Sequence, residues 1–261
     1  MKSFVNRSGL RLEYETIGEG RPFVFLHGLG GTHGQLLGFH KPLAGVRYIL
    51  PDQQGHGRSE ADFDRLDMDV MADDVIELLD RLKVEKAVFA GISMGAAVSL
   101  NAAVRHPERV EKLLLIRNAW VAEPIDEKIR LAYRDLAKAL EHDDREMFVR
   151  SRGYRVIEES GSDYTRNAFM LPFGQEYNRR YCRKYVVFPG LTPVRSEKEI
   201  EGLGMPVYIA ACRGDLCHPY EYGERIHELV EGSVFYEIPN KDEDPEEHGR
   251  LLNRIIAEVL E

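Results

Sequence analysis

The stretch that decides the fold is AVFAGISMGAA at residues 87–97. It opens with a short, uninterrupted apolar run (residues 87–90), which is typical of a strand buried on both faces. Residues 93–105 then form an alanine-rich helical pattern that stops near Pro107. Ser93 therefore lies in Gly91-Ile92-Ser93-Met94-Gly95, a sharp turn between a strand and a helix. The small residues on both sides of it allow the backbone to fold back closely.

Other strand and helix patterns alternate on both sides of this turn. Strands are expected at residues 10–16, 23–26, 48–50, 110–116, 207–210 and 234–238, and helices at 69–83, 220–230 and 245–260. Strands alternating with helices at these spacings indicate crossover connections. The sequence therefore predicts an α/β fold, with a mostly parallel sheet covered by helices on both faces.

Residues 120–201 interrupt this alternation. The segment is charged and helical in pattern, with its clearest helix at residues 127–141, and its one strand-like run is 185–188. We therefore expect an α/β core made of residues 1–119 and 202–261, which must fold together, and a helical insertion at residues 120–201.

Composition narrows the class of protein. The 261 residues are 43% hydrophobic and 30% charged, and the formal net charge is -9. This balance argues against binding to nucleic acid or to an anionic membrane surface, because both need clustered cations. No apolar stretch reaches the length of a membrane span and the first residues lack a secretory signal, so a cytoplasmic location is expected. The 3 cysteines are expected to be reduced thiols, with no metal site.

Two loops supply groups suited to chemistry at the ends of the predicted strands. The helix that begins after Ser93 points its free amides toward the hydroxyl, and the N–H of Met94 is the nearest donor for a developing oxyanion. His27-Gly28-Leu29-Gly30 follows a buried strand, and the N–H of Leu29 is expected to be the second donor. Asp52-x-x-Gly55-x-Gly57-x-Ser59 forms a further turn at a strand end, held by side-chain hydrogen bonds.

These motifs resemble those of the α/β-hydrolase fold, with matches at His27, Asp52, Gly91 and Asp215. The resemblance covers essentially the whole chain and places the insertion where that fold carries its cap. It implies a nucleophile, an acid and a histidine in that chain order, with Ser93 as the nucleophile. Asp215 follows the strand at 207–211, where the family carries its acid, and is expected to orient the histidine.

The histidine is harder to place. Family members usually carry a Gly-His pair after the last strand, but residues 238–244 contain no histidine, and the first one afterwards is His248. On chain order we expect His248, one turn into the last helix, to be the general base. His218 is the competing candidate, although it lies very close along the chain to Asp215. His27 and His56 are expected to hold turns, and His227 to face solvent.

Two further residues are candidates for binding a substrate. Arg117 ends the strand at 110–116, at the same edge of the sheet as Ser93, where it would either grip a substrate carboxylate or pair with a neighbouring acid. Trp120, the single tryptophan, would form either a pocket wall or part of the core.

Together these features predict a serine hydrolase that needs no cofactor and acts on a small carboxylic ester or lactone through an acyl-enzyme. Two alternatives stay open. One is hydrolysis of a carbon–carbon bond in a carboxylate-bearing ketone, which Arg117 motivates. The other is a small-molecule receptor on the same fold, which the missing histidine after the last strand motivates. The expected partner is a small molecule, and the sequence predicts no oligomeric state.

Overall fold

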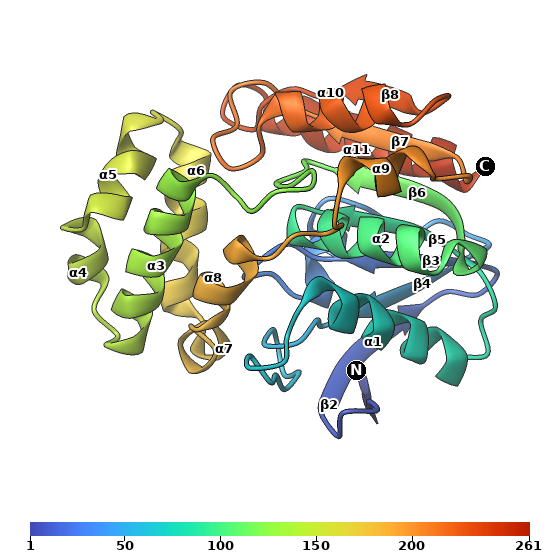
Figure 1. Ribbon diagram of the computed structural model, residues 1–261, viewed down its shortest axis with the longest axis horizontal. Coiled ribbons are helices and arrows are strands. Elements are labelled where there is room, and N and C mark those ends of the chain that lie inside the picture. Colours follow the sequence, from blue (N-terminus) through green and yellow to red (C-terminus); the bar gives the residue numbers. More distant parts are fainter.

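The computed structural model describes residues 1–261, and a single eight-stranded sheet organises it (Figure 1). The strands are β1 (Lys2–Val5), β2 (Arg11–Ile17), β3 (Arg21–Leu26), β4 (Val46–Pro51), β5 (Ala87–Ile92), β6 (Val110–Ile116), β7 (Val207–Ala211) and β8 (Val234–Glu237). Their order across the sheet is β1-β2-β4-β3-β5-β6-β7-β8. Strands β3 to β8 run parallel, and β2 is antiparallel to both of its neighbours.

Helices cover both faces of the sheet, because the central strands are apolar on both sides. The core helices are α1 (Met68–Arg81), α2 (Met94–Arg105), α10 (Tyr220–Leu229) and α11 (Pro245–Leu260). Val24 and Leu26 of β3 belong to the larger buried cluster, with residues of α1, α2 and α10. Phe23 and Phe25 face the other way, into a second cluster with residues of α11. This alternation along the apolar part of β3, residues 23–26, confirms the predicted fold class.

The turn between β5 and α2 is as sharp as the sequence suggests. Ser93 has φ 55° and ψ -115°, a conformation that side chains other than glycine rarely adopt. A Cβ atom on Gly91 would lie 2.1 Å from the carbonyl oxygen of Gly95, and one on Gly95 would lie 1.9 Å from that of Leu26. Both positions therefore require glycine, and the strained turn projects the Ser93 side chain beyond the carboxyl edge of the sheet.

The inserted segment forms a separate layer of short helices at one end of the sheet, on the left in Figure 1. Its helices are α3 (Glu127–Glu141), α4 (Arg145–Val149), α5 (Arg152–Glu159), α6 (Asp163–Met170), α7 (Glu176–Arg180) and α8 (Lys184–Val187), and α9 (Glu197–Glu201) leads back to the core. The strand-like reading of residues 185–188 is wrong. These residues form α8 and the turn after it, because Tyr185 and Phe188 bury their rings in the same cluster as α3.

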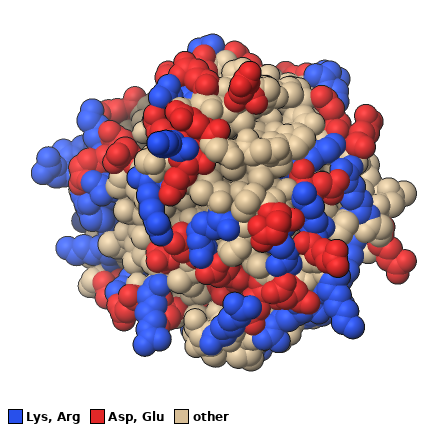
Figure 2. All heavy atoms as spheres, turned by 45° about the vertical axis from the view of Figure 1, so that its right-hand side comes forward, with Lys and Arg blue, Asp and Glu red and all other residues tan.

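The surface carries acidic and basic side chains side by side. On the face drawn in Figure 2 the two signs are interspersed, with no continuous basic area. No helix has both the length and the apolar character that crossing a bilayer requires.

Candidate active site

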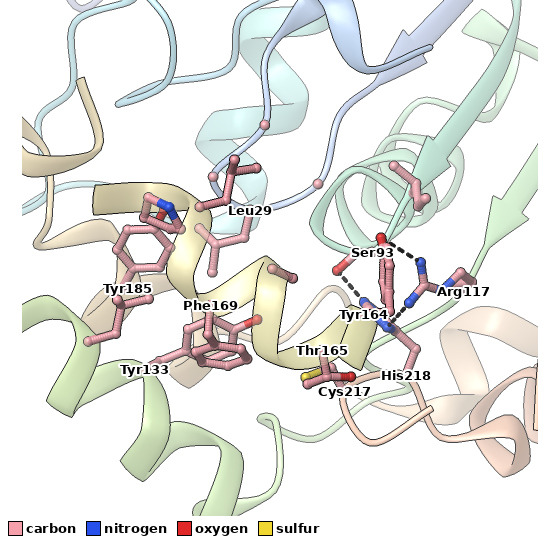
Figure 3. A pocket seen from close by; sticks show the side chains of 18 of the residues that line it. Leu29, Ser93, Arg117, Tyr133, Tyr164, Thr165, Phe169, Tyr185, Cys217 and His218 are labelled. Atoms are coloured by element: carbon pink, nitrogen blue, oxygen red, sulfur yellow. Dashed lines mark hydrogen bonds between the residues drawn. The ribbon is translucent and has the colours of Figure 1, made fainter. Parts of the chain in front are cut away.

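One imidazole joins the predicted nucleophile to the predicted acid, and it belongs to His218. Its Nε2 atom lies 2.8 Å from Oγ of Ser93, and its Nδ1 atom lies 2.9 Å from Oδ2 of Asp215. With Nδ1 donating to the carboxylate, Nε2 is left to accept the Ser93 hydroxyl proton. Figure 3 shows the contact between Ser93 and His218 in this relay, at one end of a pocket. The three side chains therefore have the geometry of a nucleophile, a base and an orienting acid.

The expectation that His248 is the base is wrong in this structure. His248 is buried at the start of α11, and its Nδ1 atom lies 2.7 Å from the carbonyl oxygen of Pro239. Its Nε2 atom has no hydrogen-bond partner. The hydrogen bond to Pro239 fixes the ring against the chain that leaves β8, while His218 occupies the position beside the Ser93 hydroxyl.

Chain order favoured His248 over His218 as the base, because only two residues separate His218 from Asp215. A turn after β7 makes this short spacing sufficient: the N–H of Cys217 donates to Oδ1 of Asp215, and Pro219 is the N-cap of α10. The loop after β8 contains no histidine, and its Asn240 side chain donates to the carbonyl oxygen of Arg213. Two features of the sequence could have identified His218 as the base: the short segment Asp215-Leu216-Cys217-His218-Pro219, which puts a histidine beside the acid, and the absence of histidine after β8.

Arg117 is engaged with the acid of this relay. Its Nε and Nη2 atoms lie 2.8 Å and 2.5 Å from Oδ2 of Asp215, and both side chains are only 4% exposed. Its Nη1 atom donates to the hydroxyl of Tyr164 over 3.2 Å. Of the two roles considered for Arg117, the structure supplies the internal ion pair, so the guanidinium is not free to bind a substrate carboxylate.

Burial and these charges shift the ionisation of the relay. Burial alone would raise the pKa of Asp215, but His218 and Arg117 outweigh it and hold that pKa well below its ordinary value. Burial lowers the pKa of His218; Asp215 opposes this effect, and the charge of Arg117 adds to it. The acid is therefore ionised and the histidine is neutral at pH 7, which is the state that a general base requires.

The loop after β3 presents a free amide next to Ser93. A Cβ atom on Gly28 would lie 3.4 Å from Cβ of Ser93, so the loop runs directly past the hydroxyl. The N–H of Gly28 donates to Gln35, and the N–H of Gly30 donates to Nε2 of His56. No hydrogen bond within the protein engages the intervening N–H of Leu29, nor that of Met94 at the start of α2. Leu29 follows Gly28 in this loop and Met94 follows Ser93, so each of these unpaired amides lies one residue from the contact between Gly28 and Ser93.

His27 and His56 hold turns, as expected. Nε2 of His27 accepts the N–H of Gln53, and Nε2 of His56 accepts the N–H of Gly30. Both rings are fully buried, and burial lowers the pKa of His27 to about 4. The two rings therefore act as neutral acceptors that fix the loops around the nucleophile.

The pocket beside Ser93 lies between the sheet edge and the inserted helices, and encloses about 170 Å³. Aromatic side chains from α3, α6 and α8 form much of its wall, namely Tyr133, Tyr164, Phe169 and Tyr185. In Figure 3 the Tyr133, Phe169 and Tyr185 side chains lie at the end opposite His218 and Arg117. Arg117 and Asp215 are the only lysine, arginine, aspartate or glutamate residues that line it, and they pair with each other. The cavity is therefore small, aromatic and close to neutral.

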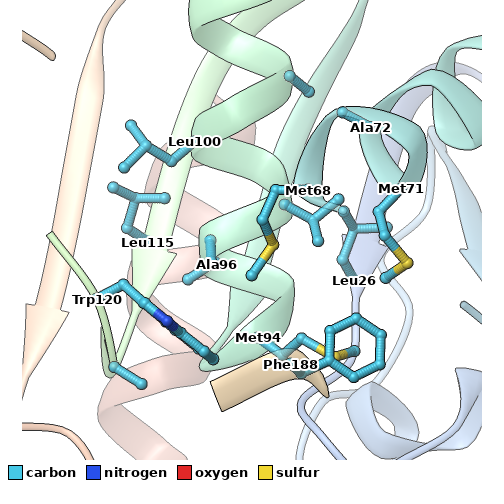
Figure 4. Close-up of a cluster of buried hydrophobic side chains, with 14 of the residues drawn as sticks. Leu26, Met68, Met71, Ala72, Met94, Ala96, Leu100, Leu115, Trp120 and Phe188 are labelled. Atoms are coloured by element: carbon cyan, nitrogen blue, oxygen red, sulfur yellow. The ribbon is translucent and has the colours of Figure 1, made fainter. Parts of the chain in front are cut away.

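Trp120 does not line this pocket, so its expected role as a pocket wall is wrong. The ring is 2% exposed and belongs to the larger buried cluster. Figure 4 shows it at the end of α2, beside Ala96 and Met94. The apolar surface of an indole fills this part of the core, which is the alternative that the sequence left open.

No group of three or more histidine, cysteine, aspartate or glutamate side chains is placed to hold a metal ion. All 3 cysteines are free thiols. Burial raises the pKa of Cys212 to about 11, so this thiol beside Asp215 is not a thiolate at neutral pH.

A family model described as the alpha/beta hydrolase fold matches residues 21–137. The chain is 27% identical to the AB hydrolase superfamily protein YisY of Bacillus subtilis, over 94% of this chain and 93% of that protein. It is 44% identical to a dihydrolipoyllysine-residue acetyltransferase component of an acetoin cleaving system from Pseudomonas putida, over 43% of this chain and 31% of that protein. It is 34% identical to a 2-hydroxymuconate semialdehyde hydrolase of Pseudomonas sp., over 46% and 44% of the two chains. The alignments with these last two relatives therefore span less than half of their length.

Solved structures show the same fold over nearly the full length. An esterase from Exiguobacterium antarcticum superposes with a TM-score of 0.77 at 20% identity, covering 99% of both chains. An enol-lactonase from Burkholderia xenovorans superposes with a TM-score of 0.74 at 20% identity, also covering 99% of both chains. At these identities the likeness concerns the arrangement of the chain.

Proposed function

We propose that this chain, which has the α/β-hydrolase fold, is a member of that superfamily and a serine hydrolase of small, uncharged carboxylic esters or lactones. The observation that carries the proposal is the relay in which His218 lies within hydrogen-bond distance of both Ser93 and Asp215. A hydroxyl at a strained turn becomes a useful nucleophile only when a positioned base removes its proton.

The reaction follows from the positions of these groups. Nε2 of His218 takes the Ser93 proton as Oγ attacks the carbonyl carbon, and Asp215 stabilises the imidazolium that forms. The N–H groups of Leu29 and Met94 stabilise the oxyanion, because neither has another partner in the protein. His218 then protonates the leaving alcohol. Water attacks the acyl-enzyme with His218 again as the base, and the carboxylic acid leaves.

The character of the pocket supports uncharged substrates over carboxylate-bearing ones. The one cation of the lining, Arg117, already bonds Asp215 and Tyr164. A second anion bound there would compete with the acid of the relay for the same guanidinium. The geometry therefore favours the ester or lactone over the carbon–carbon hydrolase, and the intact relay favours an enzyme over a receptor.

A fluorophosphonate probe tests the proposal at the nucleophile. We expect it to label the wild-type protein at Ser93 and to leave Ser93→Ala unlabelled. Ser99→Ala is the matched control, since Ser99 is a buried serine on α2, the helix that follows Ser93, and its hydroxyl has no partner. An unlabelled wild-type protein, or equal labelling of Ser93→Ala, would contradict the proposal.

A substrate pair tests the preference for uncharged groups. We expect p-nitrophenyl pentanoate to be hydrolysed with a kcat/KM at least about 10²-fold above that of p-nitrophenyl hemisuccinate, because a pocket with no free cation leaves the buried carboxylate unpaired. Equal values for the two esters would reject the preference while leaving the nucleophile intact.

A further inference from the structure

We propose that Arg117 is a positioning residue of this hydrolytic site: it fixes the Asp215 carboxylate, and its charge keeps His218 in the unprotonated form that accepts a proton. This inference rests on the proposed function, since it assigns His218 the role of base. It adds a fourth member to the relay, one that touches neither the nucleophile nor the carbonyl under attack.

The first support is how Arg117 itself is held. It directly follows β6 with φ 49°, an unusual conformation for a residue with a side chain, and its N–H donates to the carbonyl oxygen of Ala210 over 2.7 Å. This bond fixes the residue to the end of β7, the strand that leads to Asp215. The Tyr164 ring lies against the guanidinium, 4.9 Å from ring centroid to Cζ. Backbone and side chain are therefore both fixed.

The second support is the choice of carboxylate oxygen: the guanidinium binds the same oxygen of Asp215 as the imidazole does. Both of its bonds go to Oδ2 of Asp215, the oxygen that also accepts Nδ1 of His218. Asp215 Oδ1 is held separately by the N–H of Cys217. Two N–H groups that converge on one oxygen fix the position of that oxygen, and the separate bond to Oδ1 completes the orientation of the carboxylate. Arg117 thereby sets the direction in which Asp215 orients the imidazole.

The third support is the close approach of two donors. Nη2 of Arg117 lies 3.3 Å from Nδ1 of His218. Since Nδ1 donates its proton to Asp215, it has no lone pair for Arg117 to bond, and the contact places a positive charge beside the ring. That charge opposes the formation of the imidazolium in the free enzyme. The buried Asp215 carboxylate by itself would favour the imidazolium form of His218. Arg117 therefore offsets part of the effect of Asp215 on the ring.

The other groups around His218 are mainly neutral. Tyr133 of α3 and Tyr164 of α6 line the same pocket, and the Cys217 thiol precedes the ring. His248 of α11 is neutral because burial lowers its pKa to about 4. The one further cation is Lys241, in the loop before α11, which also lowers the pKa of His218. Lys241 is half-buried and bonds neither His218 nor Asp215, so it is the matched control for a cation outside the relay.

The test is the pH dependence of kcat/KM on p-nitrophenyl pentanoate. In Arg117→Gln we expect the midpoint of the acid limb to rise by about one pH unit, the effect of removing a charge within ~4–6 Å. Arg117→Lys keeps the charge but not the two-point bond, so kcat should fall while the midpoint stays near that of the wild type. Lys241→Gln should raise the midpoint by less than half as much as Arg117→Gln. An unchanged midpoint in Arg117→Gln, or equal shifts in all three variants, would overturn the proposal.

A second uncharged variant, Arg117→Met, covers the case in which Arg117→Gln does not fold. The His218 ring, followed by NMR, should titrate at a higher pH in Arg117→Met than in the wild type, because the charge beside the ring is gone. Equal titration in the two proteins would overturn the proposal. This readout needs no turnover, so a protein that resists the fluorophosphonate probe would refute the proposed hydrolase while the role of Arg117 is still measured.

Discussion

The two histidines considered for catalysis differ in what their rings contact. His218 bonds both Ser93 and Asp215, whereas His248 bonds only the carbonyl oxygen of Pro239. A base must lie within hydrogen-bond reach of the proton that it removes. Reactivity in this protein is therefore decided by one ring on the loop between β7 and α10.

We expect His218→Gln to lower kcat/KM by about 10³–10⁵-fold, because the Ser93 hydroxyl then lacks a base. His248→Gln is the matched variant, and steady-state kinetics should show its kcat/KM within about threefold of the wild type, since the amide can still donate to Pro239. If the losses were reversed, with His248→Gln the inactive variant, the assignment of the base would be wrong.

The elements of the insertion are held to one another by close packing as well as by side-chain bonds. Helices α3 and α5 cross where Gly153 lies against α3: a Cβ atom on Gly153 would lie 2.5 Å from the Cα of Ala132. The N–H of Gly153 also donates to the Asp135 carboxylate. Since α3 carries Tyr133 into the pocket, the spacing of these two helices sets the position of the aromatic wall.

Gly153→Ala should therefore destabilise the insertion. The methyl group must push α5 away from backbone atoms of α3, at a cost of about 1–3 kcal/mol, which exceeds the gain in helix propensity. We expect the Tm to fall by several degrees, measured by calorimetry. Gly174→Ala is the control, because no atom lies within 4 Å of its added Cβ, and its Tm should not change. Equal Tm values for the two variants would show that the helices are free to move apart.

On the scale of the whole molecule, buried neutral histidines link stability to pH. Burial lowers the pKa of both His27 and His248 to about 4. Unfolding returns them to the ordinary value of 6.5, so between pH 4 and 6.5 the unfolded chain binds more protons than the native protein. Asp74 acts in the opposite direction, because burial raises its pKa to about 6 and the native carboxyl then holds the extra proton.

Since the histidines outnumber this one carboxyl, we expect the free energy of unfolding to fall as the pH drops from 6.5 to 4, by about 1–3 kcal/mol for each histidine. Urea titrations at several pH values measure this slope. His248→Gln removes one titrating ring and should reduce the dependence of the free energy of unfolding on pH. The variant should differ less from the wild type in stability near pH 8 than in this dependence. A slope that His248→Gln leaves unchanged would mean that this ring does not couple folding to protonation.

Some features follow from the sequence because their causes are local. The run at residues 87–97 specifies a buried strand, a strained turn and a helix through its apolar residues and its two glycines, and these elements form where predicted. The helical periodicity of residues 69–83 likewise predicts α1, which spans Met68–Arg81. Local patterns do not distinguish a buried helix from a strand in a short apolar run, and for that reason residues 185–188 were misread.

The sequence by itself determined the parallel sheet, the place of Ser93 and the loops that surround it, because burial patterns and turn residues act over a few neighbouring positions. The tertiary structure alone decided which histidine faces the hydroxyl and which carboxylate binds Arg117. Those contacts join residues about 100 positions or more apart, and their geometry depends on how far the loops at the edge of the sheet extend toward one another.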